Sequence, residues 1–550
     1  MMIRQYSGRI KAGRTSSILW RASLPWAAVG ALLSLCILHG ISAQRDVPVP
    51  PDIDSLRDLG FIQALLDGNY WGDPSYAGEW RYYPPLVHVI IAAMARVSGA
   101  DNLVLLWTRS GIWLNLLTPL TFFLMCRRLF ACSGTAVAAT CFYVLWSGSW
   151  YTPWLMGGYT PWSLTPSIAQ TLFFISIPAI VTAPPPSLRM PSLLRAGLIG
   201  LLIGLTLLAH LVPAVILTVV VVAVTIVQAR CHPRIIVWLG VVALIELATA
   251  APYLVPTVLY YPAGMLNDAY SAYVEPLLRG ANLKQAVLVN APGILAFLAT
   301  LVLARRRRDI NAAGATALIT WVSVCSAFII HRYVCALPGV GQAHVCNIFV
   351  LTVHHYHLYL QNAWACLMGY AIWAAVQMAA QLGRLRGYRP ATAIVVLAFL
   401  ALGVRSFFNR SYDADARRGA MTDGQVFDAQ AYRWVLASTR PTDVFITDLP
   451  SDWDCPAAFA VIAAARQVVA APFDFSNSFV DWTPRNTRRQ SYLDAAARDG
   501  TGDGRFCDLQ GQRAYLLVPR DFRIRSPRLH PVYDSAYLAA YRISTEDCSP

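Results

Sequence analysis

Two aspartates, Asp52 and Asp54, lie two residues apart on a Pro-bounded segment that follows the first long apolar run of the chain. A carboxylate at the lipid–water boundary can accept the proton of a hydroxyl group while that oxygen attacks a carbon bearing a phosphate leaving group. A second carboxylate can position the reactants or bind a metal ion. The structural alternative is that both residues cap a helix that begins near Ser55, a common role for Asp.

The stretch around these acids, residues 50–88, separates two long apolar segments and is rich in aromatic side chains. It contains an amphipathic segment, 55–66, and the sequence Trp-Arg-Tyr-Tyr-Pro-Pro-Leu at 80–86. The apolar segment 85–98 follows and is too short to cross a bilayer, so we expect it to lie along the membrane surface. The polar loop 43–102 is therefore expected on one side of the membrane.

The composition defines the class of protein. Of 550 residues, 56% are hydrophobic and 13% are charged, whereas about 25% are charged in globular proteins. The chain is therefore predicted to be an α-helical polytopic membrane protein. Its net charge of +14 is compatible with nucleic-acid binding, but most Arg residues stand at the ends of apolar runs, where they set the orientation of the spans. No nucleic-acid partner is expected.

The positive-inside rule orders the spans. Basic residues before the first run place the N-terminus in the cytoplasm, Arg127-Arg128 and Arg305–Arg308 mark later cytoplasmic ends, and 196–229 must be a hairpin with His210 and Pro213 at its outer tip. The eleven predicted spans are 22–42, 103–126, 133–150, 163–183, two within 196–229, 235–257, 287–304, 311–331, 353–380 and 391–408. The protein is expected in a bacterial cytoplasmic (inner) membrane.

The composition changes after the last span. Residues 1–408 are predicted to form the membrane domain, and 409–550 a small soluble α/β domain outside the membrane. Its expected elements are strands at 443–448, 467–472, 514–519 and 539–544 and a helix at 455–466.

Five of the twelve cysteines are predicted outside the membrane, where disulfides can form. Cys335 and Cys346 share one outer loop, and Cys455, Cys507 and Cys548 share the outer domain. Their pairing stays open, and no Cys or His spacing typical of a structural zinc site occurs.

The acidic motif, the amphipathic segment and the Tyr-Tyr-Pro-Pro-Leu signature together resemble the first outer loop of the GT-C superfamily of membrane glycosyltransferases. That superfamily includes protein mannosyltransferases and aminoarabinose transferases of lipid A. Eleven spans followed by an outer domain also resemble the galactan arabinofuranosyltransferases, and residues 473–490 are weakly similar to their soluble region.

The resemblance assigns roles to the two acids. Asp54, which keeps an acid-x-x-Arg spacing with Arg57, resembles the catalytic carboxylate of the superfamily, and Asp52 resembles the second acid. The acids of the family are often adjacent, whereas Ile53 separates these two, so the choice between them stays open.

The donor of such enzymes is a polyprenyl-phosphate sugar, whose phosphate needs cations or hydrogen-bond donors at the outer interface. The candidates at that interface are Arg81, Tyr82, Tyr83, His88, Arg279, Lys284, His331, Arg332, His354, His355 and His357. For Arg and Lys the alternative is snorkelling to the lipid head groups. His354 and His357 share a helical face, and a metal site there would need an acid from elsewhere, so phosphate binding is favoured.

The resulting hypothesis is transfer of a sugar, a pentose such as arabinofuranose or a hexose such as mannose, from a polyprenyl phosphate to a glycan, lipid or protein of the cell envelope. No cofactor is required by the motifs, although a divalent metal is compatible with them. Two alternatives remain, a transporter or flippase and a non-catalytic assembly protein. A transporter places ionisable residues in its spans, and Glu246 is the main isolated one here.

Overall fold

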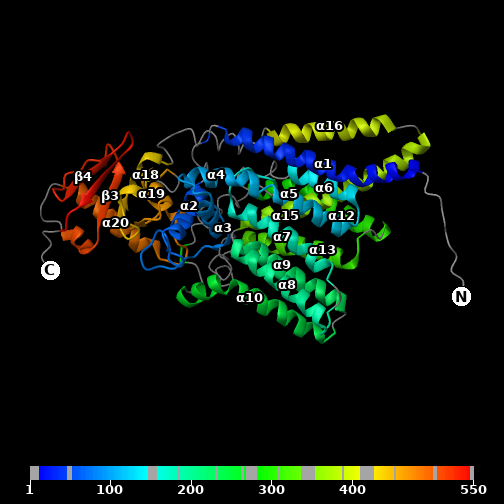
Figure 1. Cartoon of the computed structure of the whole chain (residues 1–550), viewed down its shortest axis with the longest axis horizontal. Helices are drawn as coiled ribbons and strands as arrows, with labels where there is room; N and C mark the ends of the chain where they lie inside the picture. Colours follow the sequence, from blue (N-terminus) through cyan, green and yellow to red (C-terminus); the bar gives the residue numbers. More distant parts are fainter. Residues whose placement is uncertain are drawn as a thin grey trace.

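The computed structural model describes residues 12–45, 47, 53–146, 158–183, 186–229, 232–261, 266–267, 281–307, 310–335, 353–386, 389–408, 427–450, 454–498 and 504–545. Long helices fill one part of the molecule, and a small domain that contains a β-sheet lies at the end opposite the N-terminus (Figure 1). The helices of the membrane part are α1 (Ala12–Gln44), α2 (Ile53–Leu66), α3 (Leu86–Ser98), α4 (Leu103–Leu114), α5 (Leu117–Phe130), α6 (Ser133–Leu145), α7 (Thr165–Val181), α8 (Met190–Ala209), α9 (Leu211–Ala229), α10 (Arg234–Tyr260), α12 (Ala281–Arg307), α13 (Ala312–Cys335), α15 (Val353–Arg386) and α16 (Arg389–Phe408).

Helices lie within every predicted span, with α4 and α5 together in 103–126 and α6 over only the first part of 133–150. Among the described residues, five helices are long and apolar enough to cross a membrane, namely α1 from Ser23 onward, α8, α9, α10 and α13. The number becomes six if the bent pair of α3 with 103–130 is one span. The predicted class of polytopic helical membrane protein is therefore confirmed, while the count of eleven spans stays a prediction.

The short apolar segment after the first loop does not continue into the next span. α3 makes an angle of 113° with the helical stretch 103–130. Gly99 ends α3 with a left-handed φ of 63°, a conformation that glycine adopts without steric cost. Asn102 then caps α4 by accepting a hydrogen bond from the backbone N–H of Leu105. The expected second span, 103–126, is thus two consecutive helices, α4 and α5.

The apolar stretch 196–229 is the predicted hairpin. Arg195, near the start of α8, donates a hydrogen bond to the carbonyl oxygen of Ala179, and Gln228, near the end of α9, donates one to that of Val181. Both ends of the hairpin therefore lie beside the last turns of α7. The chain reverses at His210, whose extended backbone ends α8, so His210 lies at the opposite end of the hairpin, as predicted.

The soluble domain holds a five-stranded sheet in the order β2-β1-β3-β5-β4. Its elements are α18 (Ala429–Ser438), β1 (Val444–Thr447), α19 (Pro456–Ala463), β2 (Gln467–Val468), the 3₁₀ turn η1 (Phe473–Phe475), α20 (Trp482–Ala497), the 3₁₀ turn η2 (Gly504–Leu509), β3 (Ala514–Pro519), β4 (Leu529–Asp534) and β5 (Leu538–Ile543). β1 pairs in parallel with β2 and β3, while β5 pairs antiparallel with β3 and β4. The predicted small α/β domain is confirmed.

The two faces of this sheet are covered by different helices. Phe445 and Leu517 belong to the apolar cluster that includes α19, whereas Ile446 and Leu516 belong to the cluster that includes α20. Because neighbouring residues of a strand point to opposite faces, covering both faces buries every residue of β1 and all of β3 except Pro519.

Several elements of this domain were predicted incompletely or not at all, and α18 is one that was not predicted. The expected strand 467–472 is only β2, two residues long. α20 was missed because its sequence is mostly polar and shows no clear apolar stripe. β4 was missed because it is an edge strand with an internal Pro531 and several exposed side chains. The predicted domain boundary at 409 falls within 409–426, outside the described residues.

Cys335 and Cys507 each form a disulfide. Cys346 and Cys548 lie outside the described residues, so the proposed pairing of Cys335 with Cys346 stays a prediction.

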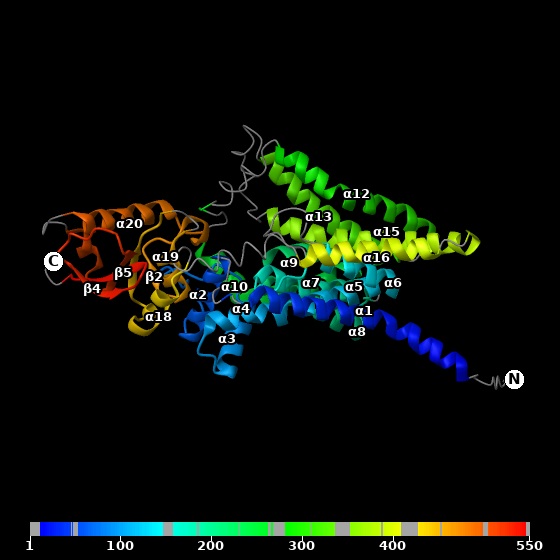
Figure 2. The same cartoon turned by 90° about the horizontal axis from the view of Figure 1, so that it is seen from above.

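The soluble domain packs directly on the first polar loop (Figure 2). α2 contributes Leu56, Leu59 and Ile62 to the same apolar cluster as α19. The backbone N–H of Val468 in β2 donates to the carbonyl oxygen of Ser75 at 2.8 Å, so the loop continues the edge of the sheet. The first loop and the soluble domain therefore lie on the same side of the membrane.

We expect Gly60→Ala to destabilise this junction. A Cβ atom at Gly60 would stand 2.2 Å from the carbonyl oxygen of Ile462 in α19, a contact that only a shift of one helix can relieve. Overpacking of this kind costs about 1–3 kcal/mol, and thermal unfolding followed by tryptophan fluorescence measures it. Gly30→Ala is the matched control, because a Cβ atom there meets nothing within 4 Å. Equal melting temperatures for the two variants would contradict the expected close packing.

Candidate active site

The first turns of α2 hold a chain of alternating charges. Arg57 Nη1 lies 2.9 Å from Asp54 Oδ1, and Arg57 Nη2 and Nε lie 3.1 and 3.3 Å from Asp58 Oδ1. The spacings of three and four residues place all three side chains on one face of the helix. Asp58 is 1% exposed, whereas half of the Asp54 side chain is exposed. Arg57 therefore forms an ion pair with the buried Asp58 and a second ion pair with the half-exposed Asp54.

The Tyr-Tyr-Pro-Pro-Leu segment and α3 pack around these charges. The Arg57 guanidinium lies 4.3 Å from the centre of the Tyr83 ring, an arrangement that stabilises a cation. Tyr83 Oη is 3.1 Å from Thr165 Oγ1 at the start of α7. His88 Nε2 lies 3.2 Å from Asp58 Oδ1, and His88 is fully buried. The local signature thus folds onto the acids, as the sequence suggested.

The pKa values of Asp54 and Asp58 are shifted in opposite directions. The surrounding protein desolvates the Asp54 carboxyl group and raises its pKa, although half of the side chain is exposed. The Arg57 charge lowers this pKa and the nearby Asp58 charge raises it, so it lies above the ordinary value. Burial also acts to raise the pKa of Asp58, but Arg57 and His88 outweigh it and leave this pKa below the ordinary value. Burial lowers the pKa of His88. Asp58 therefore stays an anion, and Asp54 is the acid that can exchange a proton.

Arg81 is a buried cation with unused hydrogen-bonding capacity. It is 5% exposed, its Nη2 donates to the carbonyl oxygen of Phe61 at 3.2 Å, and its guanidinium lies 5.0 Å from the Phe61 ring centre. Its Nε and Nη1 have no hydrogen-bond partner among the described residues. Burial lowers the pKa of Arg81 to about 10, so it remains charged at neutral pH and has donors to offer an anion.

Two histidines from distant spans meet near this cluster. The ring centres of His210, at the tip of the α8–α9 hairpin, and His355, in the first turn of α15, are 4.3 Å apart. Burial lowers the pKa of His210 to about 3, and the charges of Arg57 and Asp58 both act on it. His210 is therefore a neutral imidazole beside the α2 charges, while His357 is buried further along α15.

The structure brings together some of the predicted site residues and does not describe others. Asp54, Arg81, Tyr83 and His88 converge on α2 and Tyr82 is their neighbour, donating a hydrogen bond to Phe475 of the soluble domain. Asp52 and Arg279 lie outside the described residues, and for Lys284, Arg332 and His354 the helix is described but the side chain is not.

Sequence reasoning missed Asp58 and His210. Asp58 carried a usable signal, because it follows Asp54 by four residues and Arg57 by one on a predicted amphipathic helix. His210 was recognised as the tip of the hairpin, but its meeting with His355 depends on how α8, α9 and α15 pack.

Among the described residues, no three His, Cys, Asp or Glu side chains form a group that could hold a metal ion.

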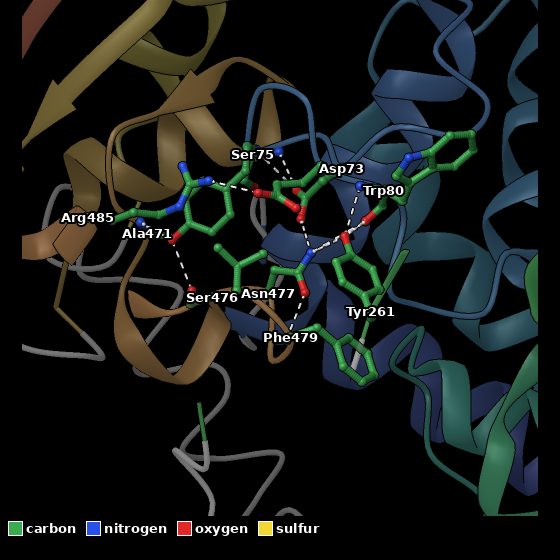
Figure 3. Close-up of polar contacts among 12 residues, drawn as sticks. Asp73, Ser75, Trp80, Tyr261, Ala471, Ser476, Asn477, Phe479 and Arg485 are labelled. Carbon is green, nitrogen blue, oxygen red and sulfur yellow. Dashed lines mark hydrogen bonds and ion pairs between the residues drawn. The ribbon is translucent and has the colours of Figure 1, made fainter. Parts of the chain in front are cut away.

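A second polar cluster joins the first loop to the soluble domain (Figure 3). Asn477 donates hydrogen bonds to Asp73 Oδ2 and Tyr261 Oη, each at 2.9 Å. Arg485 Nη2 lies 3.0 Å from Glu79 Oε1, and Tyr76 Oη is 2.9 Å from Ser476 Oγ. The soluble domain thus contacts the loop before Trp80 through these residues, and after Trp80 through the hydrogen bond of Tyr82 to Phe475.

Comparison with known proteins gives a likeness of fold. No protein-family model matches the chain, and no curated protein matches it in sequence. The apo structure of ArnT from Cupriavidus metallidurans superposes with a TM-score of 0.56, covering 96% of this chain and 100% of that one at 12% identity. ArnT bound to undecaprenyl phosphate gives a TM-score of 0.54 over 95% of this chain and 99% of that one, also at 12% identity.

A third structure comes from another organism. The oligosaccharyltransferase AglB from Archaeoglobus fulgidus, in complex with an inhibitory peptide and a dolichol-phosphate, has a TM-score of 0.52, covering 89% of this chain and 69% of that one at 13% identity. Both ArnT and AglB are GT-C membrane glycosyltransferases. This chain has the GT-C fold. The resemblance inferred from the first loop is therefore confirmed at the level of the fold, in which α2 packs against α19 of the soluble domain.

Proposed function

We propose that this protein transfers a sugar from a polyprenyl-phosphate donor to an acceptor on the outer face of a bacterial cytoplasmic membrane. The observation that carries the proposal is the half-exposed Asp54 held by Arg57, whose second partner is the buried anion Asp58. The GT-C fold supports the class of donor, since ArnT and AglB have been solved with undecaprenyl phosphate and dolichol-phosphate.

The chemistry follows from the geometry. The Asp54 carboxylate accepts the proton of the acceptor hydroxyl as its oxygen attacks C1 of the sugar, and the polyprenyl phosphate leaves with the bonding electron pair. Arg81 offers its Nε and Nη1 groups, which have no hydrogen-bond partner among the described residues, to the negative charge that develops on the leaving phosphate. The His210–His355 pair adds imidazole groups beside the α2 charges. Arg57 and Asp58 keep Asp54 in place while the substrates change.

The identity of the sugar and the acceptor is part of the proposal. Because the architecture resembles galactan arabinofuranosyltransferases, a polyprenyl-phosphate pentose such as arabinofuranose is the first donor to test, and polyprenyl-phosphate mannose is the second. The acceptor is a glycan, lipid or protein of the cell envelope. Purified protein incubated with each radiolabelled donor should release polyprenyl phosphate and label an acceptor. The proposal would be refuted if neither donor released polyprenyl phosphate when the protein was assayed in membranes of the native host.

A transporter is less well supported by the described residues. Glu246 in α10 accepts a hydrogen bond from Thr218 of α9 at 3.0 Å. The titratable residues of the candidate site lie in the first loop and at the hairpin tip, namely Asp54, Asp58, Arg81, His88 and His210. A transport pathway requires polar groups through the bilayer. Passage of a lipid-linked sugar across vesicles without its turnover would favour the transporter.

We expect Arg81→Ala and His355→Ala to weaken donor binding. A charge-assisted hydrogen bond to phosphate contributes about 1.5–3 kcal/mol, which corresponds to about 10- to 100-fold in affinity. Equilibrium binding of undecaprenyl phosphate to the purified protein in nanodiscs measures the effect. Arg520→Ala is the control, because Arg520 is an exposed Arg of the soluble domain paired with Asp534. Wild-type affinity in both test variants would assign Arg81 and His355 to structure instead.

A further inference from the structure

Asn477 connects three segments that are far apart in the sequence (Figure 3). It lies in the soluble domain and is 1% exposed. Its Nδ2 donates to Asp73 in the first loop and to Tyr261 after α10, and its Oδ1 accepts from the backbone N–H of Phe479 at 3.0 Å. Both ends of the amide are therefore bound, and its orientation is determined.

Asp73 is bound entirely by donors. Its Oδ1 accepts from the backbone N–H groups of Ser75 and Tyr76 at 2.8 and 3.3 Å, and its Oδ2 accepts from Asn477. Burial raises the pKa of Asp73 to about 6, and these hydrogen bonds oppose the shift. The hydrogen bond from the Asn477 amide, in the soluble domain, thus helps to keep the buried carboxylate of Asp73 ionised.

Tyr261 carries the connection onward to Trp80. The backbone N–H of Trp80 donates to Tyr261 Oη at 2.8 Å, and Tyr261 Oη donates in turn to the carbonyl oxygen of Trp80. Both backbone groups of Trp80 are fixed by one hydroxyl that Asn477 also holds.

The residues that follow Trp80 are those assigned to the donor. Arg81 has its backbone N–H bound to the carbonyl oxygen of Trp71 at 2.8 Å, and Tyr82 donates from its hydroxyl to the carbonyl oxygen of Phe475 at 3.3 Å. Phe475 is two residues before Asn477 in the soluble domain. The segment 81–83, called the donor loop below, is therefore attached to the soluble domain both before and within its length.

We propose that Asn477 is a positioning residue that sets the donor loop, Arg81–Tyr83, for binding of the donor phosphate by linking it through Asp73 and Tyr261 to the soluble domain. The proposal rests on the proposed function for the identity of the ligand. In this proposal the soluble domain acts on donor binding through its hydrogen bonds to the loop.

The test compares Asn477→Ala with wild type in the full chain, using undecaprenyl phosphate as the probe. Loss of the bond to a charged carboxylate should weaken binding at least about fivefold. Hydrogen–deuterium exchange of peptides covering 76–84 should become faster, because the groups that hold Trp80 lose their support. Asp67→Asn is the matched control, since it removes a different ion pair between the loop and the soluble domain, that with Arg466 at 2.9 Å. It should leave both readouts near wild type.

Asn477→Asp tests the same contact with little change of shape. The new carboxylate stands opposite Asp73, and two such groups at this distance must share one proton. The binding defect of Asn477→Asp relative to wild type should therefore be small near pH 5 and large near pH 8. The defect of Asn477→Ala should grow less over this range, because that variant adds no second carboxylate. The proposal would be overturned if the ratio of wild-type to Asn477→Asp donor affinity stayed constant from pH 5 to pH 8. It would also be overturned if the binding defect were no larger than that of Asp67→Asn.

The measurements distinguish an error in the proposed function from an error in the role of Asn477. If wild type does not bind undecaprenyl phosphate, the proposed function is wrong, and the exchange data still show whether Asn477 holds the loop. If wild type binds the lipid and Asn477→Ala matches it in affinity and in exchange of 76–84, Asn477 is not a positioning residue.

Discussion

Asp54→Asn lowers the rate of sugar transfer by about 10²-fold or more, the usual effect of removing a general base. The substitution keeps the shape of the side chain and removes its basicity. Binding of the donor should be retained, because the lipid phosphate is assigned to Arg81 and His355 and not to Asp54. Single-turnover transfer with purified protein measures the rate, and equilibrium binding of undecaprenyl phosphate confirms that the variant is folded.

The same substitution distinguishes catalysis from helix capping. Asn caps helices about as well as Asp, so a cap would lose little by this change. In the structure Asp54 lies in the first turn of α2 and forms an ion pair with Arg57. Asp52→Asn is the companion variant for the other assignment. Near-wild-type transfer by Asp54→Asn, together with an inactive Asp52→Asn, would move the role of base to Asp52.

Much of the membrane part could be predicted because its signals are local. Apolar runs bounded by Arg determine where helices begin and end, and the hairpin around His210 followed from the charges at both ends of 196–229. The site on α2 was predictable for the same reason, since Asp54, Arg57 and the Tyr-Tyr-Pro-Pro-Leu signature belong to one continuous stretch. Strands β1 and β3 are continuous apolar runs, which is what a sheet covered on both faces requires.

The remaining features depend on packing between distant segments. No periodicity in the sequence brings His210 to His355, and nothing local pairs Asn477 with Asp73. α20 contributes Tyr492 and Ala496 to the core while most of its other residues are polar, so its apolar face was too narrow to recognise. Asp58 was overlooked because one acid in a predicted amphipathic helix is usually solvent-exposed, whereas this one is buried and lies against His88 of α3.

Asp58→Asn should have two separable effects. It leaves Arg57 without its buried counter-charge, and breaking a buried pair costs about 3–5 kcal/mol of folding stability. It also removes one of the charges that raise the pKa of Asp54. The catalytic base must be ionised, so the acid limb of kcat/KM reports the pKa of Asp54, which lies above that of an ordinary Asp. In Asp58→Asn this limb should move to lower pH.

The direction of the pH effect distinguishes a positioning role from simple loss of folding. The depressed pKa of Asp58 means that its own stabilisation is present above the unfolded pKa of about 3.8 and is lost as pH falls through the folded value. Wild type therefore keeps this contribution throughout the assay range, and its absence in Asp58→Asn lowers stability equally at pH 6 and pH 8. Asp534→Asn, at an exposed ion pair, should change stability by less than about 1 kcal/mol. An acid limb that stays in place, with only the amplitude reduced, would show that Asp58 does not act on Asp54.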